Sequence, residues 1–152
     1  MIKYNNITFE MDKDFHEMTE LEKKEHNASV IPDSLSIYNS QCHTMISFQY
    51  KRINAVIGVI VDKKTLRKRM EYDYKKTQPI IGNIEEYETV IGKRKRYGFR
   101  YKYTVNNIVF IGDVLSIIDK GHSYLISCYY REENQEYGSK AMSKLLSTIV
   151  LE

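Results

Sequence analysis

The chain has 152 residues and a formal net charge of +3, a length that suits one domain covering residues 1–152. Its 42% hydrophobic and 28% charged residues are ordinary for a globular domain that builds its own core. The small net charge excludes a strongly basic nucleic-acid arm, although it leaves room for a local basic face. Two cysteines, Cys42 and Cys128, are too few for a disulfide framework.

No cleavable apolar segment follows Met1, so we expect no signal peptide. The longest apolar run, residues 55–61, is far shorter than the roughly twenty residues that a membrane-spanning helix needs. These features favour a cytoplasmic protein with both thiols free, and they predict no membrane span.

The first half of the chain alternates short strands with helical segments. Residues 7–11 predict a strand, and Phe15 follows as an aromatic anchor of the core. Thr19 and Glu22 have capping-box spacing, which predicts a helix over 20–26. Residues 36–38 and 43–52 read as strands. Leu66, Met70 and Tyr74 recur every four residues, which predicts a helix over 63–76 that ends before Pro79.

The second half predicts a β-meander and a closing helix. Strands are expected over 86–91, 94–105, 108–118 and 123–130. Gly92, Asn106-Asn107 and the loop 119–121 mark the turns between them. An apolar stripe that includes Tyr137, Met142 and Leu146 predicts a final helix over 136–149.

The strand 108–118 decides the layering. Phe110 and Val114 fall on one face, whereas Ile111 and Leu115 fall on the other, so both faces need cover. Short hairpins make the sheet antiparallel. The expected fold is therefore α+β: an α/β/α three-layer sandwich whose central antiparallel meander is flanked by helices on both faces.

This order of elements resembles the PsbP-like fold, which is shared by the photosystem II P subunit, a Ran-binding nuclear-import factor and the DcrB-like families. The likeness lies in the opening Ile7-Thr8-Phe9-Glu10-Met11 with its anchor Phe15, in the Gly92 hairpin and meander, and in the closing run 144–149. The proline common after the first strand is absent. The resemblance implies a scaffold that mostly binds other proteins, and no catalytic residue carries over from it.

A basic segment of the second meander strand is the main candidate site. Its aromatic side chains, Tyr97, Phe99, Tyr101 and Tyr103, alternate with cations, so rings and cations point to opposite faces. We expect the rings under a helix and the cations on a solvated outer face or rim. The helix 63–76 adds further cations, and the two together suggest a surface for an anionic partner, made of Lys93, Arg94, Lys95, Arg96, Arg100, Lys102, Arg67 and Lys68.

No pattern points to catalysis, to a metal or to a cofactor. His16, His26, His43 and His122 lack metal-ligand spacing. His122 and Cys128 are about 20 Å apart along one strand, beyond hydrogen-bonding reach; a cross-strand pair of Cys42 with His122 stays open. The glycines are scattered at turns, which gives no phosphate-binding loop.

We therefore expect a non-catalytic binding domain for an unknown protein partner, with a chaperone-like or adaptor role. The alternative is an anionic partner, either single-stranded nucleic acid or an acidic membrane surface, bound through the basic strand and helix. Nucleic acid is the less favoured of these, because the rings and the cations do not share a face. A monomer or a weak homodimer is expected, with 43–52 as an exposed edge strand that pairs with its own copy.

Overall fold

The computed structural model describes residues 1–26, 34–54, 68, 72 and 80–152. Its helical elements are α1 (Glu20–Glu25), the 3-10 turn η1 (Glu132–Asn134) and α4 (Gln135–Ser147). Its strands are β1 (Ile2–Tyr4), β2 (Ile7–Phe9), β3 (His16–Glu17), β4 (Leu35–Asn39), β5 (Thr44–Arg52), β6 (Ile80–Ile91), β7 (Arg94–Val105), β8 (Ile108–Asp119), β9 (His122–Arg131) and β10 (Val150–Leu151).

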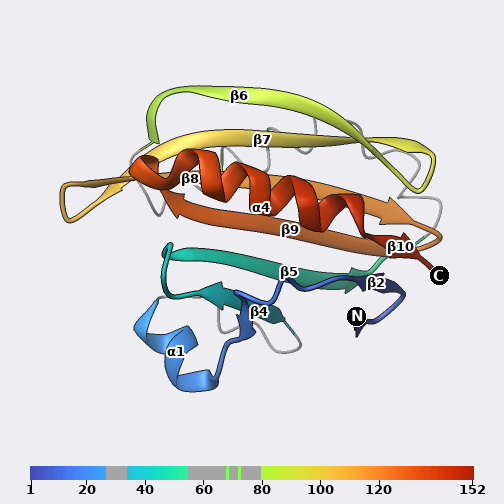
Figure 1. Cartoon of the computed structure of the whole chain (residues 1–152). Helices are drawn as coiled ribbons and strands as arrows, with labels where there is room; N and C mark the ends of the chain where they lie inside the picture. Colours follow the sequence, from blue (N-terminus) through green and yellow to red (C-terminus); the bar gives the residue numbers. More distant parts are fainter. Residues whose placement is uncertain (27–33, 55–67, 69–71, 73–79) are drawn as a thin grey trace.

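A seven-stranded sheet forms the body of the fold, in the order β3-β4-β5-β9-β8-β7-β6 (Figure 1). All its neighbouring strands are antiparallel. A small sheet, ordered β1-β2-β10, brings the two ends of the chain together. The predicted antiparallel meander is confirmed, because β6 to β9 follow one another along the chain and pair in sequence.

The meander turns where the sequence predicted. Asn106 and Asn107 have φ of 51° and 64°, and Lys120 and Gly121 have φ of 46° and 82°. Positive φ at both central residues gives a turn whose twist matches the right-handed twist of the strands. Asparagine and glycine adopt this region at little cost, which explains these residue types at the turns.

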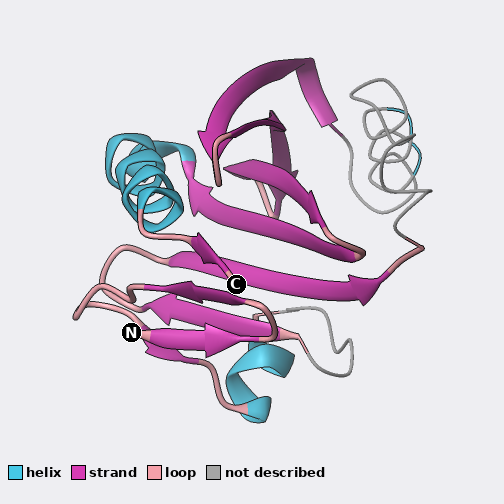
Figure 2. Ribbon diagram, turned by 90° about the vertical axis from the view of Figure 1, so that its right-hand side faces the viewer, coloured by secondary structure: helices cyan, strands magenta, loops and turns pink. Residues whose placement is uncertain are grey.

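Helix α4 packs on one face of the large sheet (Figure 2). Its apolar stripe buries Met142, Leu145 and Leu146 against β9 and its neighbours. Gly138 also faces the sheet, and a Cβ at this position would collide with the Tyr130 ring. The glycine therefore lets the first half of α4 approach β9 closely, and the predicted final helix is confirmed.

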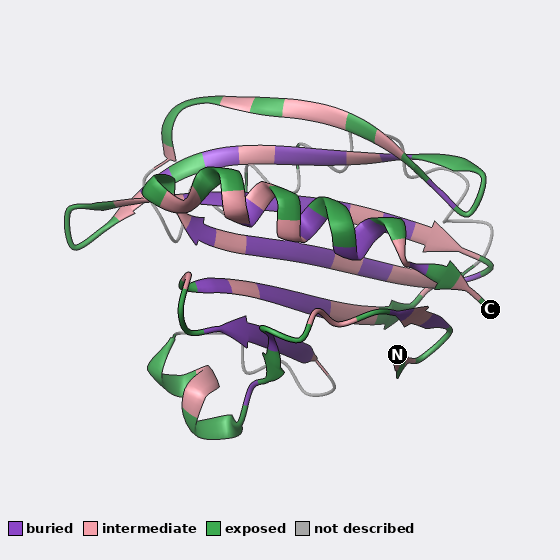
Figure 3. Ribbon diagram, viewed as in Figure 1, coloured by how far each residue is buried: buried purple, intermediate pink, exposed green. Residues whose placement is uncertain are grey.

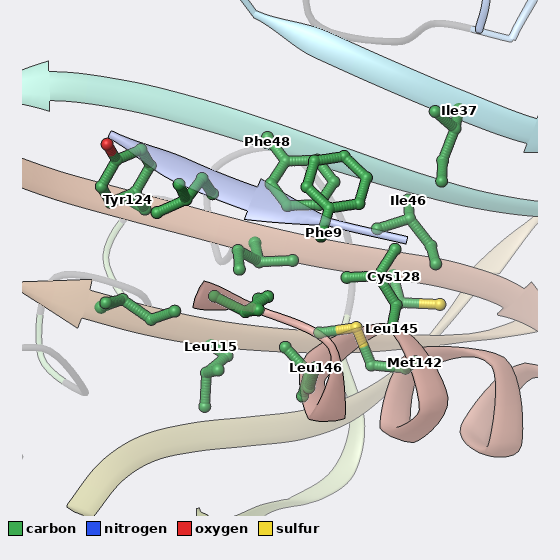
Figure 4. Close-up of a cluster of buried hydrophobic side chains, with 14 of the residues drawn as sticks. Phe9, Ile37, Ile46, Phe48, Leu115, Tyr124, Cys128, Met142, Leu145 and Leu146 are labelled. Carbon is green, nitrogen blue, oxygen red and sulfur yellow. The ribbon is translucent and has the colours of Figure 1, made fainter. Parts of the chain in front are cut away.

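The small sheet covers the same face beside α4. Phe9 of β2 stacks on Phe48 of β5, with ring centroids 4.5 Å apart, and both rings are fully buried (Figure 4). Burying one such ring stabilises the fold by roughly 1.5–3 kcal/mol. The Tyr124 hydroxyl accepts a hydrogen bond from the Asn6 backbone N–H at 2.9 Å, which fixes the turn between β1 and β2. The anchor Phe15 is buried, as predicted.

The opposite face of the sheet carries a second cluster of buried side chains: Phe99, Tyr101, Tyr103 and Val114. The centre of β8 is thus buried on both faces, with Leu115 against α4 and Val114 on the far side (Figure 3). This confirms the expected α+β sandwich. The predicted helix over 63–76, meant to cover the far face, lies outside the described residues apart from 68 and 72.

Three expectations differ from the structure. Strand β5 is not an edge strand, because it lies between β4 and β9; β3 and β6 occupy the edges. Strand β6 begins at Ile80, six residues before the predicted start at 86, with a register shift between Ile81 and Glu85. The strands β1 and β10, which the sequence did not predict, are three and two residues long, too short to show an alternation. The predicted capping box of α1 is confirmed.

Candidate functional site

The cations of β7 do not form one solvated face. Arg96 is 6% exposed. Its guanidinium donates Nε–H to the Ile91 carbonyl at 3.1 Å and an Nη1–H to the Ile118 carbonyl at 2.8 Å. The expected outer position of Arg96 is wrong, because this face of β7 is the one on which α4 lies, and the arginine ties the ends of β6 and β8 together.

Three of the seven remaining predicted cations form ion pairs. Lys102 pairs with Glu132 at 2.9 Å, Lys95 with Glu88 at 4.0 Å, and Arg100 with Asp113 at 3.2 Å. Lys93 and Arg94 are exposed at the β6–β7 hairpin. Lys68 is exposed, and Arg67 lies outside the described residues. The predicted surface is therefore largely neutralised along β7 and keeps its exposed charge at the hairpin.

A buried polar cluster lies under the edge of the α4 face. Asp113 is 2% exposed and accepts hydrogen bonds from the Tyr87 hydroxyl and from Arg100 Nε. The Arg100 guanidinium stacks over the Tyr87 ring, 4.4 Å from its centroid. A Cβ at Gly98 would collide with that ring. Gly98 thus lets Tyr87 lie flat across β7 and reach the carboxylate on β8.

Burial raises the pKa of Asp113 above its ordinary value, although the Tyr87 hydroxyl and Arg100 both favour the carboxylate. Burial also acts to lower the pKa of Arg100, but the charge and the hydrogen bond of Asp113, together with Tyr87 and Tyr130, outweigh it and leave that pKa raised. The pair therefore holds the arginine charged while the carboxylate carries a desolvation penalty. We assign the cluster a structural role, which is to join β6, β7 and β8.

The two thiols are not arranged for nucleophilic catalysis in the described structure. Burial raises the pKa of Cys128 well above its ordinary value, so the thiol stays protonated and is a weak nucleophile. His122 hydrogen-bonds to the Tyr50 hydroxyl at 2.8 Å. In the strand register it lies opposite Arg52, at the far end of β5. Cys42 precedes the start of β5, roughly 20 Å or more away at the rise of a strand, so the open Cys42–His122 pair is excluded.

A pocket of about 230 Å³ opens between α4 and the segment that follows β2. Ile37 and Ile46 of the large sheet lie beneath it, 0% and 1% exposed, and Ile46 points toward α4 (Figure 4). The other lining residues are Glu10, Met11, Asp12, Lys13, Phe15, Ala141, Lys144, Leu145 and Thr148. The volume lies below the 300–1,000 Å³ usual for small-molecule sites and suits a single large side chain.

Charged groups surround the pocket. Lys144 Nζ donates to Asp12 Oδ2 at 2.6 Å, which bridges α4 and the segment after β2. The hydrogen bond from Lys144 lowers the pKa of Asp12, and Asp12 raises the pKa of Lys144 in turn. The backbone N–H of Glu10 donates to Thr148 Oγ1 at 3.0 Å. An apolar lining within a charged rim is the arrangement that anchors a partner's apolar side chain.

Sequence reasoning missed this pocket and the Asp113 cluster. Asp113 is the single charged residue between Ile108 and Ile118, and an isolated acid in an apolar strand is a signal of a buried ion pair. The pocket gave no local signal in the sequence, because the segments that form it are distant along the chain: Lys144 and Asp12, which meet at its rim, are 132 residues apart. Among the described residues, no group of three or more His, Cys, Asp or Glu side chains could hold a metal ion.

The strand order, the meander and the closing helix together define a PsbP-like fold. No family model and no curated protein matches the sequence. Solved structures do match, and they show the fold alone because their sequences are 9–11% identical.

The cyanobacterial PsbP protein (CyanoP) of Synechocystis sp. PCC 6803 superposes with a TM-score of 0.65 at 9% identity, over 97% of this chain and 87% of its own. The Ran-binding protein Mog1p of Saccharomyces cerevisiae has a TM-score of 0.59 at 11% identity, over 96% and 90%. A protein of Bacteroides thetaiotaomicron has a TM-score of 0.67 at 10% identity; 97% of this chain is covered, but only 45% of that one.

The predicted PsbP-like recognition is thus confirmed at the level of fold. A further match, LpqN of Mycobacterium tuberculosis, is involved in cell envelope biogenesis and has a TM-score of 0.53 at 9% identity, over 95% of this chain and 82% of its own. None of the helices in the described part of the chain has the length and apolar character to cross a membrane.

Proposed function

We propose that this chain is a non-catalytic binding domain whose pocket beside α4 receives an apolar side chain of a protein partner. The observation that carries the proposal is the pocket itself: the half-buried Met11 and Ala141 line it above the buried Ile37 and Ile46, within a rim of charged groups. Interfaces gain most of their affinity where one anchor side chain fills such a pocket and polar contacts surround it.

Two further observations support a binding role. Arg96 donates hydrogen bonds to backbone carbonyls, and Arg100 and Lys102 form ion pairs within the domain. These cations of β7 therefore stabilise the fold and are not free to bind an anionic partner. The fold is also that of the Ran-binding protein Mog1p, which makes a protein partner the natural class. We also propose a cytoplasmic location, because both cysteines are free thiols and the cytoplasm keeps thiols reduced.

Filling the pocket tests the proposal. Ala141 lines it and Ser143 is exposed on the same helix, so Ala141→Phe places a ring in the pocket and Ser143→Phe places the same ring in solvent. Tagged chains are used to capture partners from a lysate of the organism that encodes them. We expect one protein to be retained by the wild type and by Ser143→Phe, and lost with Ala141→Phe.

Equal retention by both variants, at unchanged thermal stability, contradicts the pocket as the docking point. Failure of the wild type to retain any partner contradicts the binding role. Ala141→Ser, which leaves the pocket open, serves as a second control for the helix, because serine and alanine differ little in volume.

A further inference from the structure

One end of the large sheet gathers exposed cations from three separate parts of the chain. The β6–β7 hairpin, the β8–β9 hairpin and the end of β5 meet there (Figure 1, right). Arg52 is opposite His122, and His122 is opposite Asp119. The Ile53 N–H donates to the Gly121 carbonyl at 2.8 Å, which holds the end of β5 against the β8–β9 turn. We call the five exposed cations at this place the basic end: Lys51, Arg52, Lys93, Arg94 and Lys120.

The basic end carries an excess of positive charge that the rest of the described fold does not neutralise. Within the described residues none of its five cations forms an ion pair. Its one internal carboxylate is the half-buried Asp119. Five cations minus one carboxylate leave +4, more than the +3 of the whole chain. Lys3 and Glu152 lie nearby but pair with each other at 2.5 Å.

Exposed aliphatic side chains flank these cations. Val90 is 66% exposed and Val150 is 57% exposed. Val90 lies directly before the β6–β7 hairpin, opposite Lys95. Val150 belongs to β10, whose next residue, Leu151, packs against Gly92 of that hairpin. Cations beside a few exposed apolar side chains are typical of surfaces that rest on a lipid headgroup layer.

Nucleic acid fits this surface less well. Binding of single strands relies on aromatic rings that stack on the bases. The rings of the basic strand are buried on the far face of the sheet, where Phe99 and Tyr101 are 1% and 2% exposed. The basic end therefore offers positive charge and aliphatic contact without a stacking platform.

We propose that the basic end docks this domain on an anionic lipid surface. The lipid contacts are the headgroup phosphates, which meet the five cations, and the upper acyl region, which meets Val90 and Val150. The basic end does not include the pocket beside α4, so this docking is independent of the protein partner proposed above.

Co-sedimentation of the full chain with vesicles tests the proposal. The vesicles are pure phosphatidylcholine, or phosphatidylcholine with about a third of phosphatidylglycerol. We expect binding to the acidic vesicles alone, with a loss of about tenfold or more in affinity when salt rises from roughly 0.05 M to 0.5 M. No binding to acidic vesicles at low salt overturns the proposal.

A neutralised pair and a matched control locate the surface. Lys93→Asn with Arg94→Gln removes two charges, and asparagine suits the positive φ of 63° at position 93. Lys24→Gln with Lys140→Gln removes two exposed charges elsewhere, outside the pocket. We expect about a tenfold loss for the first pair and less than about twofold for the second. Equal losses contradict a localised surface, and tighter binding to a single-stranded oligonucleotide than to acidic vesicles contradicts the lipid assignment.

Discussion

The Arg100–Asp113 pair in the large sheet and the Lys144–Asp12 pair at the pocket both join separate elements on the α4 face, but they meet water differently. The Asp113 side chain is 2% exposed, whereas those of Asp12 and Lys144 are 33% and 68% exposed. The pKa of Asp113 is raised by burial, and that of Asp12 is lowered by its lysine.

This contrast separates an ion pair that holds the fold together from an ion pair that is free to change partners. A buried pair is costly to break, since either charge left alone is desolvated without compensation. An exposed pair contributes little to stability and exchanges readily with water. The Asp113 cluster is therefore suited to structure, and the Lys144–Asp12 pair is suited to open for a bound partner.

Breaking the buried pair has the largest expected effect. Arg100→Ala leaves the Asp113 carboxylate buried without its cation, and we expect the free energy of unfolding to fall by about 3 kcal/mol, the low end for buried pairs because Arg100 is partly open to solvent. Urea denaturation measures this change. Lys144→Ala is the control at the exposed pair, and a loss there as large as that of Arg100→Ala contradicts the contrast.

Removing the Tyr87 hydroxyl has the next largest effect. Tyr87→Phe keeps the ring across Gly98 and deletes the hydrogen bond to Asp113, so we expect a loss of about 2 kcal/mol, as for other bonds to a charged group. Combined with Arg100→Ala, the loss should be non-additive, because both variants act on the same carboxylate. Additive losses in this double-mutant cycle argue against one shared cluster.

The pH dependence of Asp113 sharpens the comparison. Because its folded-state pKa is raised, the folded chain retains a proton that the unfolded chain has released. The stability due to protonated Asp113 is present below the unfolded pKa of about 4 and is lost as the pH rises through the folded pKa. Asp113→Asn removes this loss, so the stability of the wild type minus that of the variant should fall from pH 4 to pH 7. An unchanged difference contradicts the raised pKa.

Asp12 should show the smallest effect, with the opposite sign. Its lowered pKa gives stability that is present above the unfolded value and is lost as the pH falls through the folded pKa. The wild type minus Asp12→Asn difference should therefore be largest near pH 7 and shrink in acid. Thermal melts at a series of pH values check this, and added salt should reduce it because the pair is exposed. A difference that grows in acid is incompatible with the Lys144 contact.

The sequence predicted the elements of this fold better than the surroundings of single residues. Alternation in β7 showed that Arg96 and Arg100 share a face. It could not show that α4 and the small sheet cover this face, because alternation assigns residues to two faces without showing what packs on either one. The turn at Asn106 and Asn107 was predictable because its cause is local. The pocket was not, because Asp12 and Lys144 meet only after the chain has formed the whole sheet.

The most direct test of the binding role is site-specific photocrosslinking in the cells that encode the chain. A photoreactive residue at Lys13 reports on the pocket, and one at Lys24 on α1 serves as the control. We expect one discrete adduct from position 13, none from position 24, and loss of the adduct when Ala141→Phe fills the pocket. Adducts of equal strength from both positions, or an adduct that persists with the pocket filled, would contradict the account.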